Sequence, residues 1–270
     1  MKPKENAETI KKSYDQAPEK EWERTDNTVE YHITTRMLEK MIVAGEKVLD
    51  IGGGPGRYSL WLARKGCDVT LFDLSSGNVA FAREKAVKEG VTLKTICGNA
   101  MDKALYPMEK FDHVLVMGPM YHIFREEDRR KVIENALQVL KPGGKIYIAF
   151  INLFAGMLYY LDEWPEGFSE ELKLENEFGE CVLENRSWQG MAFTEARFEA
   201  LSEICRFTGS LGLKQVTLFG QEGFLGGFLT KIQGLTEPHR SLWIDYACRT
   251  CELTEYLGMS SHIMYVGEKV

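Results

Sequence analysis

Four glycines in five residues follow a short apolar run near residue 50, and no other feature constrains the fold of this chain as strongly. The run Lys47–Ile51 predicts a buried strand. The segment Gly52-Gly53-Gly54-Pro55-Gly56 then leads into an amphipathic stretch, Tyr58–Arg64, which ends before Gly66. A strand that ends in such a turn and opens a helix presents free backbone N–H groups and the positive end of the helix dipole to a ligand. A tight turn alone needs fewer glycines, so the pattern favours a site for a nucleotide-like ligand.

Apolar, strand-like runs alternate with amphipathic stretches along most of the chain. Strands are predicted at 47–51, 68–73, 92–96, 113–117, 145–151, 214–219 and 261–266, and helices at 58–64, 76–90, 126–140 and 194–207. Alternation of this kind is typical of α/β folds, in which crossover helices join parallel strands. We therefore expect a Rossmann-like, mostly parallel sheet of seven strands with helices on both faces, together with a helical cap and insertions.

The remaining length lies outside this alternation. At roughly 150 residues per domain, the 270 residues would make nearly two domains. We instead expect residues 1–46 to form a helical segment that covers the ligand site. Residues 47–270 should form one domain with insertions at about 152–192 and 221–258, which form a lid. The first insertion contains Tyr159, Tyr160, Trp164, Phe168, Phe178 and Trp188. An aromatic lid suits an apolar or aromatic small molecule.

The composition of the chain limits which partners it can bind and where in the cell it is expected. The chain has 33 Lys and Arg residues against 40 Asp and Glu residues, a net charge of −7, so we expect no nucleic-acid partner. No apolar run reaches the roughly 18 residues of a membrane span, and the first residues lack an apolar signal core, which predicts a cytoplasmic protein without a membrane partner. The six cysteines are expected to be free thiols. Cys248 and Cys251 form a single CxxC without further ligands nearby, so no metal site is predicted. The sequence does not indicate an oligomeric state.

The glycine turn departs from the dinucleotide-binding fingerprint G-x-G-x-x-G. Counted from Gly52 the sixth position is Arg57, and counted from Gly54 it is Ser59, so a nicotinamide or flavin cofactor is disfavoured. The run Val48-Leu49-Asp50-Ile51-Gly52-Gly53-Gly54-Pro55-Gly56 instead resembles the first motif of the class I S-adenosylmethionine-dependent methyltransferases. S-adenosylmethionine carries an ammonium and a sulfonium group but no phosphate, so an acidic residue at the turn suits it.

The resemblance implies S-adenosylmethionine as the cofactor and assigns residues to it. Asp50 would lie near the methionine moiety. The cofactor would lie across the backbone of four glycines: Gly52, Gly53, Gly54 and Gly56. Asp73, at the end of the second strand, would accept hydrogen bonds from the ribose hydroxyls, although an aspartate there could instead cap the next helix. Leu74 would flank the adenine.

A second segment resembles the part of the family that reads the edge of the adenine. In Gly98-Asn99-Ala100-Met101-Asp102, a polar side chain and the following backbone N–H would make these contacts, which points to Asn99 and Ala100. Many members of the family carry aspartate at the position of Asn99. The amide oxygen of Asn99 can still accept a hydrogen bond, so either Asn99 or Asp102 makes the contact.

The segment after the fourth predicted strand, Met117-Gly118-Pro119-Met120-Tyr121-His122, resembles the Gly-Pro-Met/Leu-Tyr-His sequence of a bacterial subgroup of these enzymes. Met117 and Gly118 would line the cofactor. Tyr14 resembles a tyrosine in a segment that folds over the cofactor in related enzymes, although it could equally be an ordinary packing residue.

The sequence therefore predicts methyl transfer to a small-molecule acceptor by in-line displacement, which depends mainly on alignment and on exclusion of water. His122 is the first candidate for a base, and a role in the loop or in cofactor binding is the alternative. Tyr121 could orient the acceptor or line the wall. The methylated atom, oxygen, nitrogen, sulfur or carbon, is not indicated. The alternative function is a sensor or scaffold that binds S-adenosylmethionine or S-adenosylhomocysteine without catalysis.

Overall fold

A seven-stranded sheet forms the centre of the computed structural model, which describes residues 3–24, 28–167 and 173–270. Its strands are β1 (Lys47–Ile51), β2 (Asp68–Asp73), β3 (Lys94–Cys97), β4 (Phe111–Val116), β5 (Leu140–Ile151), β8 (Lys214–Gly220) and β9 (His262–Glu268). They lie in the order β3-β2-β1-β4-β5-β9-β8. Neighbours from β3 to β5 pair in parallel, whereas β9 runs antiparallel to both β5 and β8. The predicted Rossmann-like, mostly parallel sheet is confirmed.

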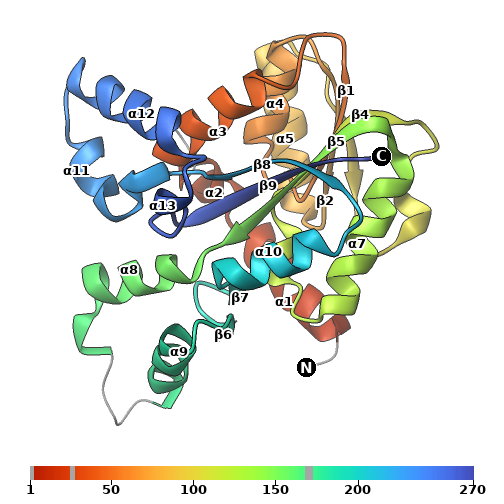
Figure 1. The fold of residues 1–270 in the computed structure, drawn as a ribbon. Helices are drawn as coiled ribbons and strands as arrows, with labels where there is room; N and C mark the ends of the chain where they lie inside the picture. The colour runs from red at the N-terminus through yellow and green to blue at the C-terminus, as the bar shows by residue number, and fades with distance from the viewer. Residues whose placement is uncertain (1–2, 25–27, 168–172) are drawn as a thin grey trace.

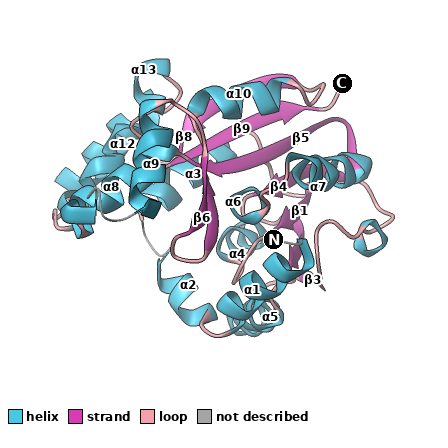
Figure 2. Cartoon of the chain, turned by 90° about the horizontal axis from the view of Figure 1, so that it is seen from below, coloured by secondary structure: helices cyan, strands magenta, loops and turns pink. Residues whose placement is uncertain are grey.

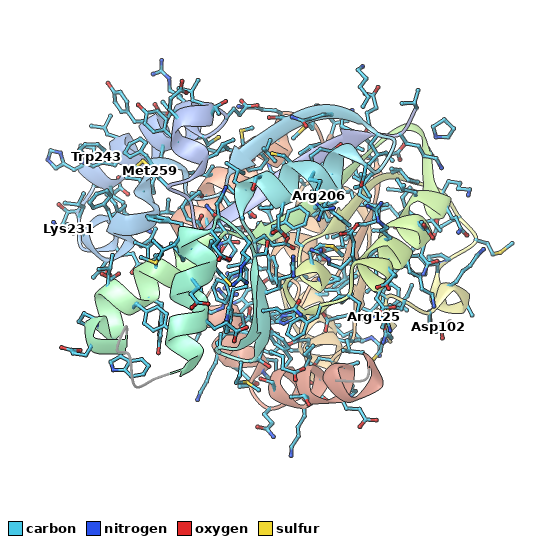
Figure 3. The ribbon with its side chains drawn as sticks, turned by 60° about the horizontal axis from the view of Figure 1, so that its bottom comes forward. Asp102, Arg125, Arg206, Lys231, Trp243 and Met259 are labelled. Atoms are coloured by element: carbon cyan, nitrogen blue, oxygen red, sulfur yellow. The ribbon has the colours of Figure 1, made fainter. Side chains whose placement is uncertain are left out.

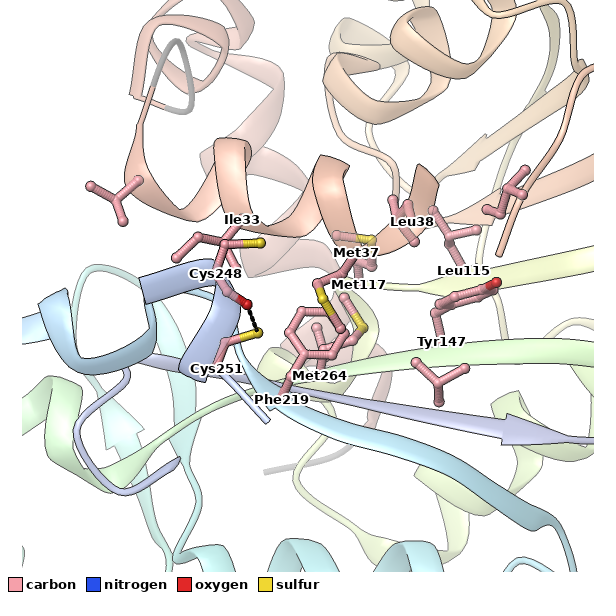
Figure 4. Close-up of a cluster of buried hydrophobic side chains, with 14 of the residues drawn as sticks. Ile33, Met37, Leu38, Leu115, Met117, Tyr147, Phe219, Cys248, Cys251 and Met264 are labelled. Atoms are coloured by element: carbon pink, nitrogen blue, oxygen red, sulfur yellow. Dashed lines mark hydrogen bonds between the residues drawn. The ribbon is translucent and has the colours of Figure 1, made fainter. Parts of the chain in front are cut away.

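Helices cover both faces of the sheet (Figure 1). On one face, α3 (Val29–Glu39), α4 (Arg57–Arg64) and α12 (His239–Thr250) enclose a buried core. Figure 4 shows this core, in which Ile33 and Met37 lie near Phe219 and Met264. On the other face, α7 (Glu126–Val139) and α10 (Leu201–Gly209) enclose a second core. Both faces of the inner strands are thus buried, which explains why β1 and β4 read as continuous apolar runs.

The helix after β2 follows its sequence signals closely. Helix α5 (Ser76–Glu89) begins after Ser75, whose hydroxyl oxygen accepts a hydrogen bond from the backbone N–H of Asn78 at 3.1 Å. It ends at Gly90, which adopts a left-handed conformation with φ of 68°. A serine at the N-cap and a glycine after the last turn are the residues that helix ends favour.

The predicted helix at 194–207 is wrong in its first part. Residues Glu195–Phe198 form a short strand, β7, that pairs antiparallel with β6 (Trp188–Met191), and α10 begins only at Leu201. The rings of Trp188 and Phe198 lie 5.8 Å apart across this hairpin. Pairing and aromatic packing, both long-range, outweigh the local helical spacing here. In addition, Lys141–Gly144, which we expected to precede the fifth strand, is part of β5.

The first insertion forms a separate layer at one end of the sheet (Figure 1). It contains α8 (Leu153–Glu163), the short helix η2 (Pro165–Gly167), α9 (Lys173–Leu183) and strand β6. Its buried residues form a small cluster of their own: Leu153, Phe178, Cys181 and Trp188. Phe168, one of the aromatic residues that we singled out, lies outside the described residues.

The second insertion packs on α3 and on β8 at the edge of the sheet. It contains η3 (Gly223–Phe228), α11 (Leu229–Gln233), α12 and α13 (Thr254–Leu257), and α12 contacts α3. Cys248 and Cys251, at the end of α12, are buried in the core, and the Cys251 thiol donates a hydrogen bond to the Cys248 carbonyl oxygen (Figure 4). Among the described residues, no helix combines the length and the apolar character that crossing a bilayer requires.

Candidate functional site

One cavity of about 1330 Å³ opens along the edge of the sheet where the parallel strands end. Asp50, Asp73, Met117 and Ile151 bring the carboxyl ends of β1, β2, β4 and β5 to it. Because β9 runs antiparallel, its first residue, His262, lies at the same edge and also lines the cavity. Ligands of open α/β sheets bind at this edge.

Gly52, Gly53 and Gly54 of the glycine turn line the cavity at the end of β1, whereas Gly56 does not and packs against Ala82 of α5. Gly52, Gly54 and Gly56 adopt φ values of 73°, 56° and 90°, which favour glycine. A β-carbon on Gly52 would lie 2.5 Å from the Pro119 ring. The turn therefore passes close under the loop after β4, and its backbone is open to a ligand on the cavity side.

Asp50 lines this cavity and carries an unsatisfied hydrogen-bond acceptor. Its Oδ2 accepts a hydrogen bond from the Ser59 hydroxyl at 2.6 Å, whereas its buried Oδ1 has no hydrogen-bond partner among the described residues. Burial raises the pKa of Asp50 to about 6. A buried carboxylate oxygen without a partner is unfavourable, so a cationic group of a ligand would satisfy it. The ammonium group of S-adenosylmethionine fits this position.

Asp73 ties the glycine turn to the start of α5. Its Oδ2 accepts the backbone N–H of Gly54 at 2.8 Å, and its Oδ1 accepts that of Ser75 at 2.8 Å. Oδ1 also accepts the Asn78 side-chain amide at 3.4 Å, so the second lone pair of Oδ2 is the acceptor capacity left for a ribose hydroxyl. Leu74, the next residue, also lines the cavity.

Asn99 and Ala100 line the cavity, whereas Asp102 does not. The exposed Asp102 side chain caps η1 (Lys103–Leu105) by accepting the backbone N–H of Ala104, and Figure 3 shows it at the outer edge of the molecule. Of the two residues that the sequence left open, only Asn99 is in a position to meet a ligand. Its Oδ1 accepts the backbone N–H of Met101 at 2.9 Å.

The N-terminal helices form another wall. Helices α1 (Pro3–Asp15) and α2 (Pro18–Arg24) lie beside α5 (Figure 2). Asp15 accepts hydrogen bonds from the Ser75 hydroxyl at 2.6 Å and the Gly77 backbone N–H at 2.9 Å, which anchors α1. Burial opposes ionisation, but the hydrogen bonds from Gly77 and Lys11 hold the pKa of Asp15 at about 2.

Tyr14 and His122 meet across the cavity wall. The His122 Nδ1 lies 2.8 Å from the carbonyl oxygen of Glu195, which can only accept, so Nδ1 carries the proton. Its Nε2 then accepts the Tyr14 hydroxyl, 3.0 Å away. Burial lowers the pKa of His122. Both ring nitrogens are thus engaged, which favours the structural role of His122 over the role of a free base. Tyr121, Met117 and Gly118 line the cavity as well.

Sequence reasoning missed a second histidine at this edge. His262 Nδ1 lies 2.6 Å from Oε1 of the buried Glu222. Glu222 and His262 line the cavity, as does Glu30 at the start of α3. His262 stands at the start of a predicted apolar strand. This position places it at the edge of the cavity only if the strand runs antiparallel, which the sequence does not show.

Aromatic side chains surround the part of the cavity beneath the first insertion. They are Tyr159, Tyr160, Trp164, Phe178, Trp188, Phe193 and Phe198. The Tyr160 and Phe178 rings lie 5.5 Å apart, and Phe193 lies 6.1 Å from the His122 ring. The insertion thus presents a wide apolar surface to a ligand.

Comparisons with known proteins agree with this geometry. Residues 48–144 match the family described as "Methyltransferase domain". The ubiquinone biosynthesis O-methyltransferase of Cronobacter sakazakii is 33% identical over 137 residues, covering 48% of this chain and 55% of that protein. Methyltransferase GfsG of Streptomyces halstedii is 34% identical over 122 residues, covering 44% and 43%. The match to this chain thus spans about half the length of these curated relatives.

Two solved structures share the fold over nearly the whole chain. The N-methyltransferase NodS of Bradyrhizobium japonicum, in complex with S-adenosylhomocysteine, has a TM-score of 0.58 at 13% identity and covers 97% of this chain and 98% of its own. The 1,6-didemethyltoxoflavin-N1-methyltransferase of Burkholderia thailandensis has a TM-score of 0.61 at 13% identity, with coverages of 100% and 91%. At this identity the likeness shows the fold alone. The chain thus resembles the class I S-adenosylmethionine-dependent methyltransferases in the motifs of residues 48–144 and in its fold.

Proposed function

We propose that this protein transfers a methyl group from S-adenosylmethionine to a small-molecule acceptor. One observation carries the proposal: Asp50, whose buried Oδ1 has no hydrogen-bond partner among the described residues, and the glycine turn line a cavity that continues to the aromatic surface of the first insertion. The cavity, about 1330 Å³, is larger than the roughly 300–1,000 Å³ that one small ligand takes. It has room for a cofactor and an acceptor side by side.

When bound, S-adenosylmethionine supplies a methyl group on a sulfonium. In this proposal the protein binds and orients the cofactor through Asp50, the glycine turn, Asp73 and Leu74. Asn99 and the backbone of Ala100 meet the edge of the adenine. Alignment and exclusion of water are the main contributions that a protein makes to a displacement of this type.

Tyr14 and His122 close the cofactor site from the side of α1. The hydrogen bond between them joins the N-terminal segment to the loop after β4, which carries Met117 and Gly118. In this proposal the segment 1–46 covers the cofactor, and the insertion at 152–192 covers the acceptor. Of the insertion at 221–258, only Glu222, Leu229 and Gln233 line the cavity, so it contributes to the wall more than to a lid.

The aromatic surface favours an acceptor with a planar, largely apolar body. The curated relatives named as ubiquinone biosynthesis O-methyltransferases point to the same class of acceptor. We further propose that the protein works in the cytoplasm, where its six thiols, all free in the structure, stay reduced. We propose no nucleic-acid or membrane partner, because the net charge of −7 repels polyanions.

Isothermal titration calorimetry tests the cofactor first. We expect binding of S-adenosylmethionine and S-adenosylhomocysteine and no binding of NADH, and heat with NADH alone would refute the proposal. Release of S-adenosylhomocysteine in the presence of candidate acceptors then tests turnover. Tight cofactor binding without turnover of any acceptor would favour a sensor or scaffold instead.

A further inference from the structure

Glu222 and His262 form a carboxylate–imidazole pair on the cavity wall. The Glu222 side chain is 2% exposed and the His262 side chain is 20% exposed, so the carboxylate lies behind the ring. Glu222 Oε1 lies 2.6 Å from His262 Nδ1. Its Oε2 accepts the Ser260 hydroxyl at 2.6 Å and the His262 backbone N–H at 2.9 Å. Three hydrogen bonds therefore fix this carboxylate.

The pair fixes the proton on the imidazole ring. A carboxylate only accepts, so His262 Nδ1 carries the proton that it donates to Glu222, and Nε2 holds a lone pair in the neutral ring. Nε2 makes no hydrogen bond to any described residue. Since Nδ1 is turned to the buried carboxylate, Nε2 is the nitrogen left for a ligand in the cavity. His122 differs, because its Nε2 already accepts the Tyr14 hydroxyl.

Several charged and titratable groups face His262. Glu222 and Glu30 are negative, Arg24 of α2 is positive, and the Tyr121 ring lies 5.9 Å away. Burial lowers the pKa of His262, but the Glu222 carboxylate outweighs burial and leaves the pKa above its ordinary value. Burial also opposes ionisation of Glu222, yet His262 holds the pKa of that carboxyl below its usual range.

A resident metal ion is the competing interpretation of these residues. Oxygen atoms of Glu30 and Glu222 and a ring nitrogen of His262 all lie within 4.8 Å of one another. Both oxygens of Glu222, however, already accept hydrogen bonds from His262 and Ser260. Glu30 Oε1 also accepts a hydrogen bond, from the Tyr58 hydroxyl at 3.3 Å, so both carboxylates are already engaged. Only His262 Nε2 is without a hydrogen-bond partner among the described residues, whereas a catalytic metal site typically has three or more protein ligands. The pair is better arranged for proton transfer.

We infer that His262, oriented by Glu222, is the general base that deprotonates the methyl acceptor, an inference that rests on the proposed function. In the step, the acceptor O–H bond breaks, and the proton goes to His262 Nε2. The electron pair of the acceptor oxygen forms the bond to the methyl carbon, and the electrons of the carbon–sulfur bond return to sulfur. Glu222 is a positioning residue, which stabilises the imidazolium that forms.

This base selects a class of acceptor. An acceptor must offer an acidic proton to Nε2 while its body lies against the aromatic surface of the cavity. A phenolic hydroxyl meets both requirements, because its proton is far more acidic than that of an aliphatic alcohol. Hydroxylated aromatic molecules are therefore the acceptor class.

Nuclear magnetic resonance of ring-labelled histidine tests the pair without any acceptor. We expect a proton on Nδ1 and none on Nε2 of His262 at pH 8, and a pKa above 6.5. In Glu222→Gln the attraction is lost while burial remains, so this pKa should fall. A matched control is Glu46→Gln, because Glu46 Oε2 pairs with His113 Nε2 at 2.9 Å and neither residue lines the cavity. That variant should leave His262 unchanged. A proton on Nε2, or an unshifted pKa in Glu222→Gln, would overturn the inference.

Turnover with a panel of hydroxylated benzoates tests the role in catalysis. His262→Asn should lower kcat by about 10²- to 10⁴-fold, while the Kd for S-adenosylhomocysteine stays within threefold. The acid limb of the kcat profile should move to lower pH in Glu222→Gln and stay in place in Glu46→Gln. Activity of His262→Asn within threefold of the parent, or loss of activity with a chelator and recovery with Mg²⁺, would refute the base. Failure of the parent to bind S-adenosylhomocysteine would instead refute the proposed function and leave the histidine measurements valid.

Discussion

The fit of the glycine turn under the loop after β4 can be measured by a pair of substitutions. Gly52→Ala places a β-carbon 2.5 Å from the Pro119 ring and 3.1 Å from the Gly118 α-carbon, at a φ of 73°. Gly143→Ala is a matched control, because Gly143 has nearly the same φ, 74°, and nothing within 4 Å of the added carbon. The two variants share the backbone strain and differ in the steric clash.

The expected losses of stability follow from the backbone strain and the steric clash. A left-handed conformation is less favourable by about 1–2 kcal/mol for a residue with a β-carbon. Overpacking adds about 1–3 kcal/mol. Gly143→Ala should therefore lower the free energy of unfolding by about 1–2 kcal/mol, and Gly52→Ala by about 2–5 kcal/mol, in urea denaturation. A shifted turn also moves away from the cofactor, so Gly52→Ala should raise the Kd for S-adenosylhomocysteine at least tenfold, about 1.4 kcal/mol. Gly143→Ala should leave it within twofold. Equal losses of stability, or equal affinities, would refute the reasoning.

Three further predictions concern buried charges. Asp73→Ala should weaken S-adenosylhomocysteine binding strongly in calorimetry, and an affinity within about threefold of the parent, under 1 kcal/mol, would refute the ribose contact. Arg129→Met leaves the Glu199 carboxylate, 2% exposed, with Arg197 as its remaining ion-pair partner, and should lower the free energy of unfolding by about 3 kcal/mol. Adding Glu199→Gln should recover part of that loss in thermal unfolding, and no recovery would contradict the ion-pair explanation. Burial raises the pKa of Asp50 from 3.8 to about 6, so the folded state favours its protonated form, and this contribution to stability disappears as pH rises from 4 through 6. Asp50→Asn should abolish that pH dependence and stabilise the free protein at pH 7 by up to roughly 3 kcal/mol, while weakening cofactor binding; a loss of stability at pH 7 would contradict it.

The gathering of residues at the carboxyl ends of the parallel strands could be predicted because its signals are local. Strand β1, the glycine turn and Ser75 at the start of α5 are each specified within a few residues of sequence. Parallel strands end at one edge, so Asp50, Asp73 and Asn99 gather there without further information. The choice between Asn99 and Asp102 could not be made, because it depends on how the η1 turn directs the Asp102 side chain.

The cavity wall that contains His262 and His122 could not be predicted because its geometry is long-range. His262 reaches the cavity only because β9 inserts antiparallel between β5 and β8, a pairing between distant parts of the chain. The partner of His122, the Glu195 carbonyl, lies in β7, which we expected to be helical. The contact of Asp15 with the start of α5, which anchors α1, could not be predicted either.

The small cluster of Leu153, Phe178, Cys181 and Trp188 is separate from the two cores that hold the sheet. The changes in the free energy of unfolding caused by substitutions in this cluster and around the glycine turn should therefore be additive, because distant sites that share no contacts behave independently. For a laboratory that wishes to change the acceptor, this means that the cluster can be redesigned without changing the two cores, provided that the pairing of β6 with β7, which carries the Glu195 carbonyl bonded to His122, is kept. For a lineage of such proteins, it is a route by which new acceptors could be acquired while the methyl donor stays the same.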